Sequence, residues 1–255
     1  MSAFARTLAV LLGLATVLHG SAQPLEGVMV ETYQVRERAD GQPPLTTYRV
    51  FLDLAPDHRL QVIYGDEAHA LRIETFPQFE NTPNGSVVYG DRASFKPTDH
   101  EVMSSDSWLT IGMVGSKHVG VPREMDPDGS MLECPSFNPA KHRKLDPLCI
   151  ADGLAPADSS VEVINWRLDR GYLGEVRGKD IYSNDAAWAV LGGMKGATPE
   201  NMVLVAQITT AGPLHFVLNA QIGTPDGRVV KVVASKPAEG ELVLDALTYG
   251  VRPKY

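Results

Sequence analysis

The sequence predicts an all-β protein, namely a single β-sandwich or jelly-roll-like domain with at most a short helix. Three observations support this prediction. Short runs of alternating apolar and polar residues recur along the chain, turn residues separate them, and no strands alternate with long helical segments. The third observation disfavours a parallel α/β sheet, because such a sheet needs strand and helix units in alternation.

The clearest strand is residues 47–54, in which Tyr48, Val50, Leu52 and Leu54 fall on one face of an extended chain. Successive side chains of a strand point to opposite faces, so this run has one buried face. Similar short runs, rich in β-branched or aromatic residues, predict the other strands. In chain order these are residues 28–35, 59–64, 70–75, 107–113, 161–166, 202–209, 214–222, 229–234 and 241–244.

Turn residues connect these runs. Thr224–Arg228 contains Pro-Asp-Gly and predicts a tight hairpin, because Pro fixes φ and Gly accepts a positive φ. Residues 81–85 end in Asn-Gly and predict another turn. The single helical signal is the apolar run 185–191, which ends at Gly192 and Gly193. We expect one or two helical turns there.

Residues 1–22 have the pattern of a secretory signal peptide. Arg6 precedes a short apolar run, and Gly20 and Ala22 stand three and one positions before a cleavage point after Ala22. A membrane-spanning helix needs about 20 apolar residues, more than this run or any later one provides. We therefore expect a mature chain that begins at Gln23, has no transmembrane segment, and is exported to an extracellular, cell-surface or periplasmic location.

The charge balance excludes one class of partner. The chain has 23 Lys and Arg against 31 Asp and Glu, which gives a formal net charge of -8. No basic surplus is present to bind phosphate backbones, so nucleic acid is not an expected partner. An acidic chain suits solubility or the binding of divalent cations.

Residues 118–160 break the strand pattern, since they are rich in Pro, Asp, Gly and Lys and lack periodicity. We interpret them as a long loop within one domain that covers residues 23–255. The loop contains both cysteines of the sequence, Cys134 and Cys149. In an oxidising compartment the even count favours one disulfide, with free buried thiols as the alternative. Two sulfurs alone make a poor zinc site.

Calcium is the one cofactor that the sequence suggests. Within Met125-Asp-Pro-Asp-Gly-Ser130, the carboxylates of Asp126 and Asp128 stand two residues apart before a Gly, so both can turn toward a hard cation. The loop lacks the bidentate Glu at the twelfth position of an EF-hand, and an ordinary Asx turn also explains these residues. Residues 64–67 form a second acidic turn.

No catalytic residue can be assigned from sequence patterns. No His of the mature chain stands three or four residues from another, which excludes a His-Glu-x-x-His motif. The fragment Gly112-Met-Val-Gly-Ser116 lacks the Gly-x-Ser-x-Gly elbow of esterases, because Lys117 and His118 follow Ser116. A carboxylate pair for glycoside hydrolysis is defined by a separation in the fold and not by sequence spacing.

The three tryptophans have two interpretations. Trp108, Trp166 and Trp188 could form a platform on which sugars stack, or they could fill the core. Trp108 and Trp166 lie in predicted strands and Trp188 in the short apolar run 185–191, which favours the core. Two tryptophans exposed on one face would favour a glycan-binding module.

Three stretches carry a family resemblance. They are Thr47-Tyr-Arg-Val-Phe-Leu-Asp-Leu54 with Leu60-Gln-Val-Ile-Tyr-Gly-Asp66, then Asp106-Ser-Trp-Leu-Thr-Ile-Gly112, then Leu204-Val-Ala-Gln-Ile-Thr-Thr210 continuing to Leu218-Asn-Ala-Gln221. Together they resemble an uncharacterised secreted domain of environmental and marine bacteria, found singly or repeated in large extracellular proteins, some with a type IX secretion sorting tail.

The resemblance runs from Val28 to Tyr249 and implies a β-rich fold with an extracellular or cell-surface role, without known catalytic residues. The segment from Cys134 to Cys149 departs from it, and no obvious sorting tail precedes Tyr255. Together with the export signal and the missing catalytic motifs, it favours a non-catalytic exported module for adhesion or ligand binding. A glycan or matrix component is the expected class of ligand. A secreted hydrolase of polysaccharides or esters is the alternative.

A disulfide between Cys134 and Cys149 would close a loop of ~15 residues, and chain entropy would then stabilise the protein by ~3 kcal/mol. Peptide mapping of secreted protein without reductant should recover the two cysteine peptides linked. Quantitative labelling of both thiols in native, unreduced protein would contradict the disulfide.

Overall fold

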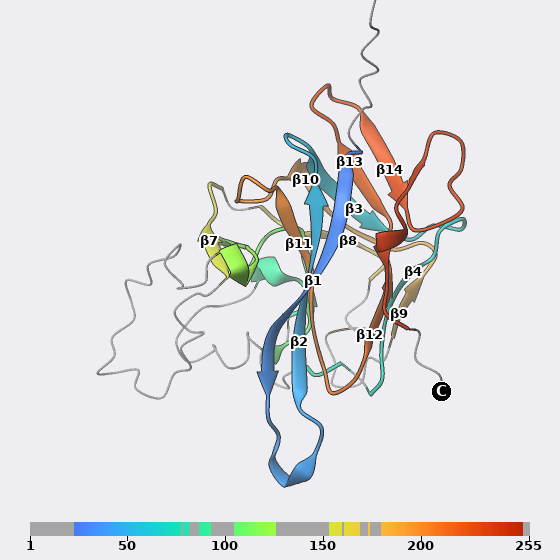
Figure 1. Cartoon of the computed structure of the whole chain (residues 1–255). Coiled ribbons are helices and arrows are strands. Elements are labelled where there is room, and N and C mark those ends of the chain that lie inside the picture. The colour runs from blue at the N-terminus through green and yellow to red at the C-terminus, as the bar shows by residue number, and fades with distance from the viewer. Residues whose placement is uncertain are drawn as a thin grey trace, which may run out of the picture.

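The computed structural model describes residues 23–77, 79–81, 87–92, 105–125, 153–159, 161–168, 173 and 180–251. The elements whose bounds lie within these residues are strands and short 3-10 turns (Figure 1), so the all-β prediction is confirmed. Among the same residues, no helix has both the length and the apolar character needed to cross a membrane.

The strands are β1 (Leu25–Arg36), β2 (Leu45–Leu54), β3 (Arg59–Tyr64), β4 (Leu71–Thr75), β5 (Trp108–Leu109), β6 (His118–Gly120), β7 (Leu154–Pro156), β8 (Ile164–Trp166), β9 (Asp180–Ser183), β10 (Ala187–Met194), β11 (Met202–Thr210), β12 (Leu214–Val217), β13 (Ala220–Gly223), β14 (Val229–Val233), β15 (Leu242–Val243) and β16 (Thr248–Tyr249). The 3-10 turns are η1 (Ala39–Gly41), η2 (Gly90–Arg92), η3 (Arg123–Met125) and η5 (Asp245–Leu247).

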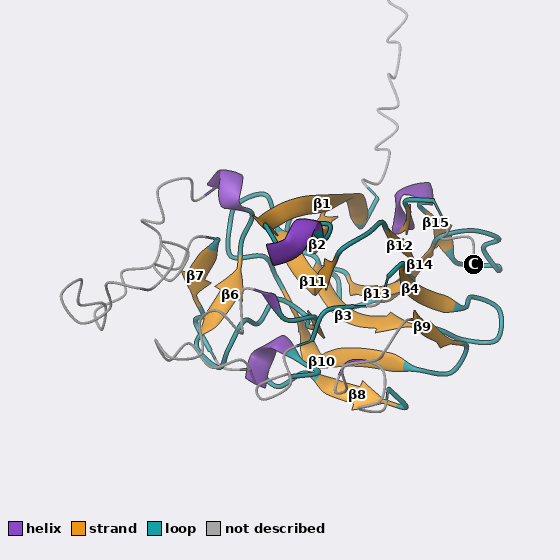
Figure 2. Ribbon diagram, turned by 90° about the horizontal axis from the view of Figure 1, so that it is seen from below, coloured by secondary structure: helices purple, strands orange, loops and turns teal. Residues whose placement is uncertain are grey.

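These strands form three main sheets and one small ladder (Figure 2). Sheet A has the order β1-β2-β11-β5, sheet B the order β15-β14-β13-β3-β10-β8, and sheet C the order β16-β12-β4-β9. β6 and β7 form a separate two-stranded ladder, and Val119 of β6 also makes an isolated bridge with Met113. Apart from the parallel pair β14–β15, the strand pairs of these sheets are antiparallel, as expected for a sandwich of short strands.

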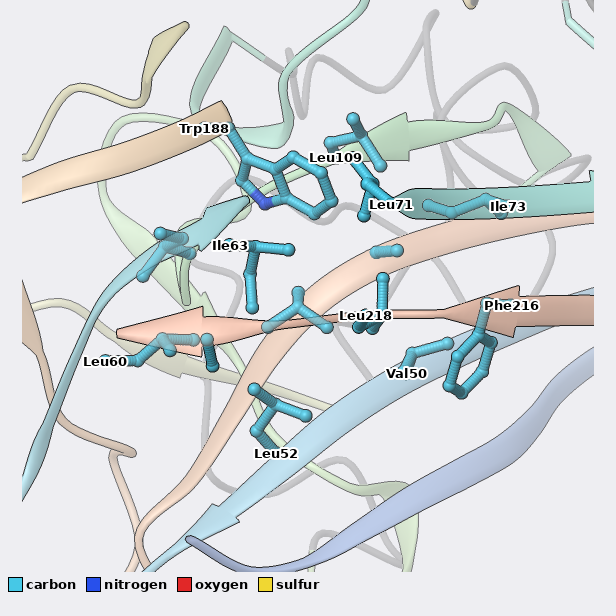
Figure 3. Close-up of a cluster of buried hydrophobic side chains, with 14 of the residues drawn as sticks. Val50, Leu52, Leu60, Ile63, Leu71, Ile73, Leu109, Trp188, Phe216 and Leu218 are labelled. Carbon is cyan, nitrogen blue, oxygen red and sulfur yellow. The ribbon is translucent and has the colours of Figure 1, made fainter. Parts of the chain in front are cut away.

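The main hydrophobic core lies where the three sheets face one another (Figure 3). It buries side chains from alternate positions of each sheet. These include Val50 and Leu52 of sheet A, Leu60, Ile63 and Trp188 of sheet B, and Leu71, Ile73 and Phe216 of sheet C. The alternating patterns read from the sequence therefore mark the core faces of these strands.

The chain passes directly from sheet C to sheet B between β12 and β13. The predicted strand 214–222 is in fact β12 and β13, which pair with β4 and β3 respectively. The break falls at buried Asn219, whose Nδ2 donates to the carbonyls of Tyr64 at 3.2 Å and His69 at 3.1 Å. Its Oδ1 accepts the N–H of Ala234 at 3.3 Å. This amide holds three backbone segments at the junction of the two sheets.

Sheet A is buried on its second face as well. Phe51 and Leu204 pack there against Trp108 and Leu154. Further along the same face, the buried guanidinium of Arg49 donates from Nε to Gln207 Oε1 at 3.0 Å and from Nη1 to Gly153 O at 3.1 Å. The segment around β7 therefore forms an additional layer over sheet A.

The helix predicted at residues 185–191 is wrong, because this segment is part of β10. Ala187 and Ala189 pair with β3 on one side and with β8 on the other. Trp188 is fully buried while Ala187 and Ala189 are half-buried, which is the alternation of a strand. Pairing on both edges overrides the helical preference of the Ala-rich run.

The loop predicted at 118–160 is also partly wrong, since its two ends form the ladder β6–β7. His118 pairs with Pro156 and Gly120 with Leu154. These strands are three residues each, too short to give a periodic signal. β9 and β16 were missed for the same reason, and the predicted strand 107–113 is reduced to β5, because the chain bends at Gly112, where φ is +76°.

The predicted hairpin at Thr224–Arg228 is confirmed. It joins β13 and β14, with Gly223 paired to Val229. Thr224 N–H donates to Arg228 O at 2.9 Å, and Gly227 has a φ of +83°. The Gly in this turn supplies a conformation that other residues rarely adopt.

The Asn219 amide gives a prediction of stability. In Asn219→Ala, two backbone carbonyls and one buried N–H each lose a hydrogen bond, so the free energy of unfolding should fall by about 2–4 kcal/mol. Urea unfolding measures the loss. Asn165→Ala, at an exposed position of β8, is the matched control and should change stability by less than about 0.5 kcal/mol. Equal stability of the two variants would contradict the role of Asn219.

Candidate functional site

A pocket of about 410 Å³ opens between the ladder β6–β7 and the end of β10. This volume lies within the range of ~300–1,000 Å³ found for small-molecule sites. Val119 and Pro156 line it from the ladder, and Leu191 and Met194 line it from β10. Arg59, at the start of β3, lies on the same wall as the β10 residues.

A β-bulge in β10 shapes this wall. Ala189 pairs with Val62 and Met194 with Leu60, so residues 190–193 stand opposite a single residue of β3. Gly192 and Gly193 have φ values of +76° and +71°. A Cβ on Gly193 would lie 2.9 Å from the Cβ of Arg59, so only Gly fits there. The bulge therefore presents backbone to the pocket.

The polar groups of the pocket are Arg59, Asp158, Ser159 and Lys195. Lys195 Nζ is paired with Asp57 Oδ1 at 2.6 Å. Hydrogen bonding to Lys195 lowers the pKa of Asp57 below its ordinary value. Arg59 donates only a long hydrogen bond of 3.5 Å to Gly193 O, and no carboxylate of the described residues forms an ion pair with it. Arg59 is thus the cation of the pocket that forms no ion pair among the described residues, and the exposed Asp158 is the corresponding carboxylate.

The described lining residues of the pocket include few groups capable of acid–base chemistry. Among the described lining residues, none is His, Cys or Glu, and Asp158 is the single carboxylate. The neighbouring His118 lies on β6 next to Val119, and alternation points the two side chains to opposite faces. Burial, with a smaller effect of Lys117, lowers the pKa of His118.

The other described histidines hold backbone carbonyls. His58 Nδ1 lies 2.9 Å from Pro56 O, His69 Nε2 lies 3.1 Å from Lys236 O, and His215 Nδ1 lies 2.7 Å from Tyr249 O. His69 and His215 are buried, each beside a carboxylate, Glu241 in one case and Glu74 in the other. These contacts fix loops and strand ends.

The predicted calcium ligands Asp126 and Asp128 and the predicted disulfide between Cys134 and Cys149 lie outside the described residues. Within the part of the chain that the structure describes, no group of three or more His, Cys, Asp or Glu side chains is placed to hold a metal ion. In the second acidic turn, Asp66 Oδ1 accepts the N–H groups of Ala68 at 3.1 Å and His69 at 2.8 Å. This is an Asx turn.

The tryptophans divide between core and surface. Trp108 and Trp188 are fully buried, as the sequence favoured, and Trp188 Nε1 donates to Thr110 O at 2.8 Å. The core position that the sequence favoured for Trp166 is wrong, because this residue lies on the edge strand β8 of sheet B and is 64% exposed. Because Trp166 is the one exposed residue among Trp108, Trp166 and Trp188, these residues do not provide two exposed tryptophans on one face. That arrangement would have favoured a glycan-binding module.

The start of β8 is held by a half-buried carboxylate. Asp91 in η2 accepts the N–H of Val163 at 3.2 Å through Oδ2, and its buried Oδ1 has no hydrogen-bond partner among the described residues. Burial raises the pKa of Asp91, and this effect exceeds the opposing effects of the Val163 N–H and Arg92. Asp91 thus positions the strand that carries Trp166.

Sequence reasoning missed the pocket because its walls come from four separate segments, around residues 59, 119, 156–161 and 191–197. One signal was present. The pair Gly192 and Gly193 was interpreted as the end of a helix, whereas an isolated Gly pair within a strand pattern also indicates a bulge.

Comparisons of the chain with protein-family models, with curated proteins and with solved structures found no match.

The raised pKa of Asp91 predicts a pH dependence of stability. The carboxyl group of Asp91 binds its proton more tightly in the folded chain than in the unfolded chain. Its contribution to the free energy of unfolding is therefore fully present below the ordinary pKa of 3.8. This contribution is lost as pH rises through the raised pKa. Asp91→Asn keeps the acceptor for Val163 without the buried charge. At neutral pH it should be as stable as the parent or more stable, and this difference should shrink toward pH 3 in urea unfolding.

Asp185→Asn is the control of opposite sign. Hydrogen bonds from Arg167 and Ser183 lower the pKa of exposed Asp185, so the parent should be the more stable protein at neutral pH and lose this advantage in acid. A stability loss in Asp91→Asn that is equal at every pH would contradict the effect of its buried charge.

Proposed function

We propose that the protein is a non-catalytic exported binding module that acts outside the cell or at its surface. Its ligand binds in the pocket beside the β10 bulge. The single observation that carries this proposal is the composition of the pocket. A cation without an ion pair among the described residues and exposed glycine backbone both lie beside apolar lining residues. A few convergent polar groups in a mostly preformed cavity are typical of ligand sites.

The same pocket argues against the alternative of a secreted hydrolase. A nucleophile needs a base within hydrogen-bond reach, and Ser159 has no hydrogen-bonded His or carboxylate among the described residues. The buried histidines among the described residues lie within hydrogen-bond distance of backbone carbonyls and are shielded from solvent. Binding without turnover is the activity that these contacts support.

The test uses the mature chain, residues 23–255, and a substitution that fills the pocket. Ala197 lines the pocket and is exposed, so Ala197→Trp should occupy the cavity without disturbing the core. The binding panel consists of immobilised polysaccharides and matrix proteins. A ligand found there should bind Ala197→Trp at least about tenfold more weakly, a loss of about 1.4 kcal/mol. Ala238→Trp, at an exposed position in the β14–β15 loop, is the matched control and should bind as the parent does.

Turnover assays on polysaccharides, esters and peptides accompany the binding panel. We expect no product from any of them. Product formation that a single serine, histidine or carboxylate substitution abolishes would establish the hydrolase and overturn the proposal.

A further inference from the structure

On the outward face of sheet B, the strand register places small side chains of β10 between larger side chains of β8 and β3, which implies a shallow trough along β10. The three strands lie side by side in Figure 2. Ala187 of β10 stands between Trp166 of β8 and Tyr64 of β3. One step along the same face, Ala189 stands between Ile164 and Val62. Paired residues of antiparallel strands point to the same face, so two small side chains form the floor and larger ones the walls.

Trp166 provides a flat aromatic surface on one wall. Its exposure of 64% contrasts with the complete burial of Trp108 and Trp188. The neighbouring Arg167 lies 5.8 Å from the ring centroid and is paired with Asp185. An exposed tryptophan ring offers a large rigid contact area that suits the apolar face of a sugar ring.

The trough leads directly to the pocket. Leu191 continues the outward positions of Ala187 and Ala189 and lines the pocket. From Ala187 to Leu191 the strand advances by ~13 Å, at ~3.3 Å per residue. Trp166 at one end and Arg59 at the other therefore belong to one continuous surface. The row through Ile164, Ala189 and Val62 continues across the sheet to Gln221 and Lys231, which adds hydrogen-bonding groups.

We propose that this surface, the β10 groove, binds an acidic oligosaccharide. One sugar ring stacks on Trp166, and a carboxylate or sulfate group of the same chain pairs with Arg59. The inference rests on the proposed function and names its class of ligand.

Charge and shape favour this occupant. Arg59 has no carboxylate partner among the described residues, whereas Lys195, Arg167 and Lys231 each have one. An anionic group of the ligand would complete the ion pairing at Arg59 and accept from its planar guanidinium in a bidentate manner. The spacing of the aromatic ring from the cation suits a chain of several units and not a single small anion.

The exposed tryptophan also provides the readout. Because Trp108 and Trp188 are buried, a change in tryptophan emission on titration reports mainly on Trp166. The probes are a polyuronate oligomer, a sulfated oligosaccharide and a neutral oligosaccharide of the same length, measured by fluorescence and by calorimetry. We expect at least one acidic oligomer to bind, with a change in emission, and the neutral one to bind at least about tenfold more weakly.

Two variants and two controls locate the site. Trp166→Ala and Arg59→Gln should each weaken binding of the acidic oligomer at least about tenfold. Tyr182→Ala changes an exposed aromatic residue of sheet C, and Arg228→Gln changes an exposed arginine of the β13–β14 turn. Both controls should bind as the parent does. The uronate and sulfate arms show which acidic group the groove prefers.

Three outcomes would overturn the inference. Equal binding of neutral and acidic oligomers, with no effect of Arg59→Gln, would remove the acidic requirement and leave the proposed function intact. Binding that neither Trp166→Ala nor Arg59→Gln weakens would place the ligand elsewhere. Absence of binding to every oligosaccharide would exclude the ligand class, whereas the effect of Ala197→Trp on other ligands would still decide the proposed function.

Discussion

The position of Trp188 determines how the rest of the molecule is arranged. Its ring fills the core between the sheets, and its N–H donates to Thr110 O just beyond β5 of sheet A. A buried indole N–H without a partner would be costly, so this bond fixes sheet B against sheet A. Because side chains alternate along a strand, the inward Trp188 places Ala187 and Ala189 outward. The floor of the β10 groove is thus a consequence of core packing.

The opposite wall of the pocket depends on a second buried contact. Arg49 reaches from sheet A to Gly153 O, immediately before β7, and its guanidinium lies 3.5 Å from the ring centroid of Tyr33. A buried guanidinium needs its donors satisfied, so the contact with Gly153 holds the ladder β6–β7 over sheet A. Each wall of the pocket is therefore held by a buried contact of its own, and the two walls meet where Met194 packs against the cluster of Val119 and Ala155.

The sequence predicts the parts of this structure in which local pattern and tertiary pairing agree. β1, β2, β3, β4 and β11 follow their alternating runs closely. The prediction fails at β10, where Ala residues with a helical preference pair on both edges, and at β6 and β7, which are too short for a period. Within the candidate site, the sequence analysis considered Trp166 for sugar stacking although it favoured the core. It did not consider Arg59. Arg59 stands out because it forms no ion pair with a carboxylate of the described residues. Whether a charged side chain finds such a partner depends on the fold and cannot be inferred from the sequence.

The ladder β6–β7 has an evolutionary consequence. It brings Gly120 and Leu154 opposite each other, so the two ends of the segment between them lie side by side at the base of the ladder. The entropy of closing a loop rises slowly with its length, by ~0.6 kcal/mol for each doubling. The chain between Met125 and Gly153 can therefore change in length at a small cost in closure entropy. This base is a natural point for acquiring new sequence, and a suitable one for inserting a tag or a whole domain by design.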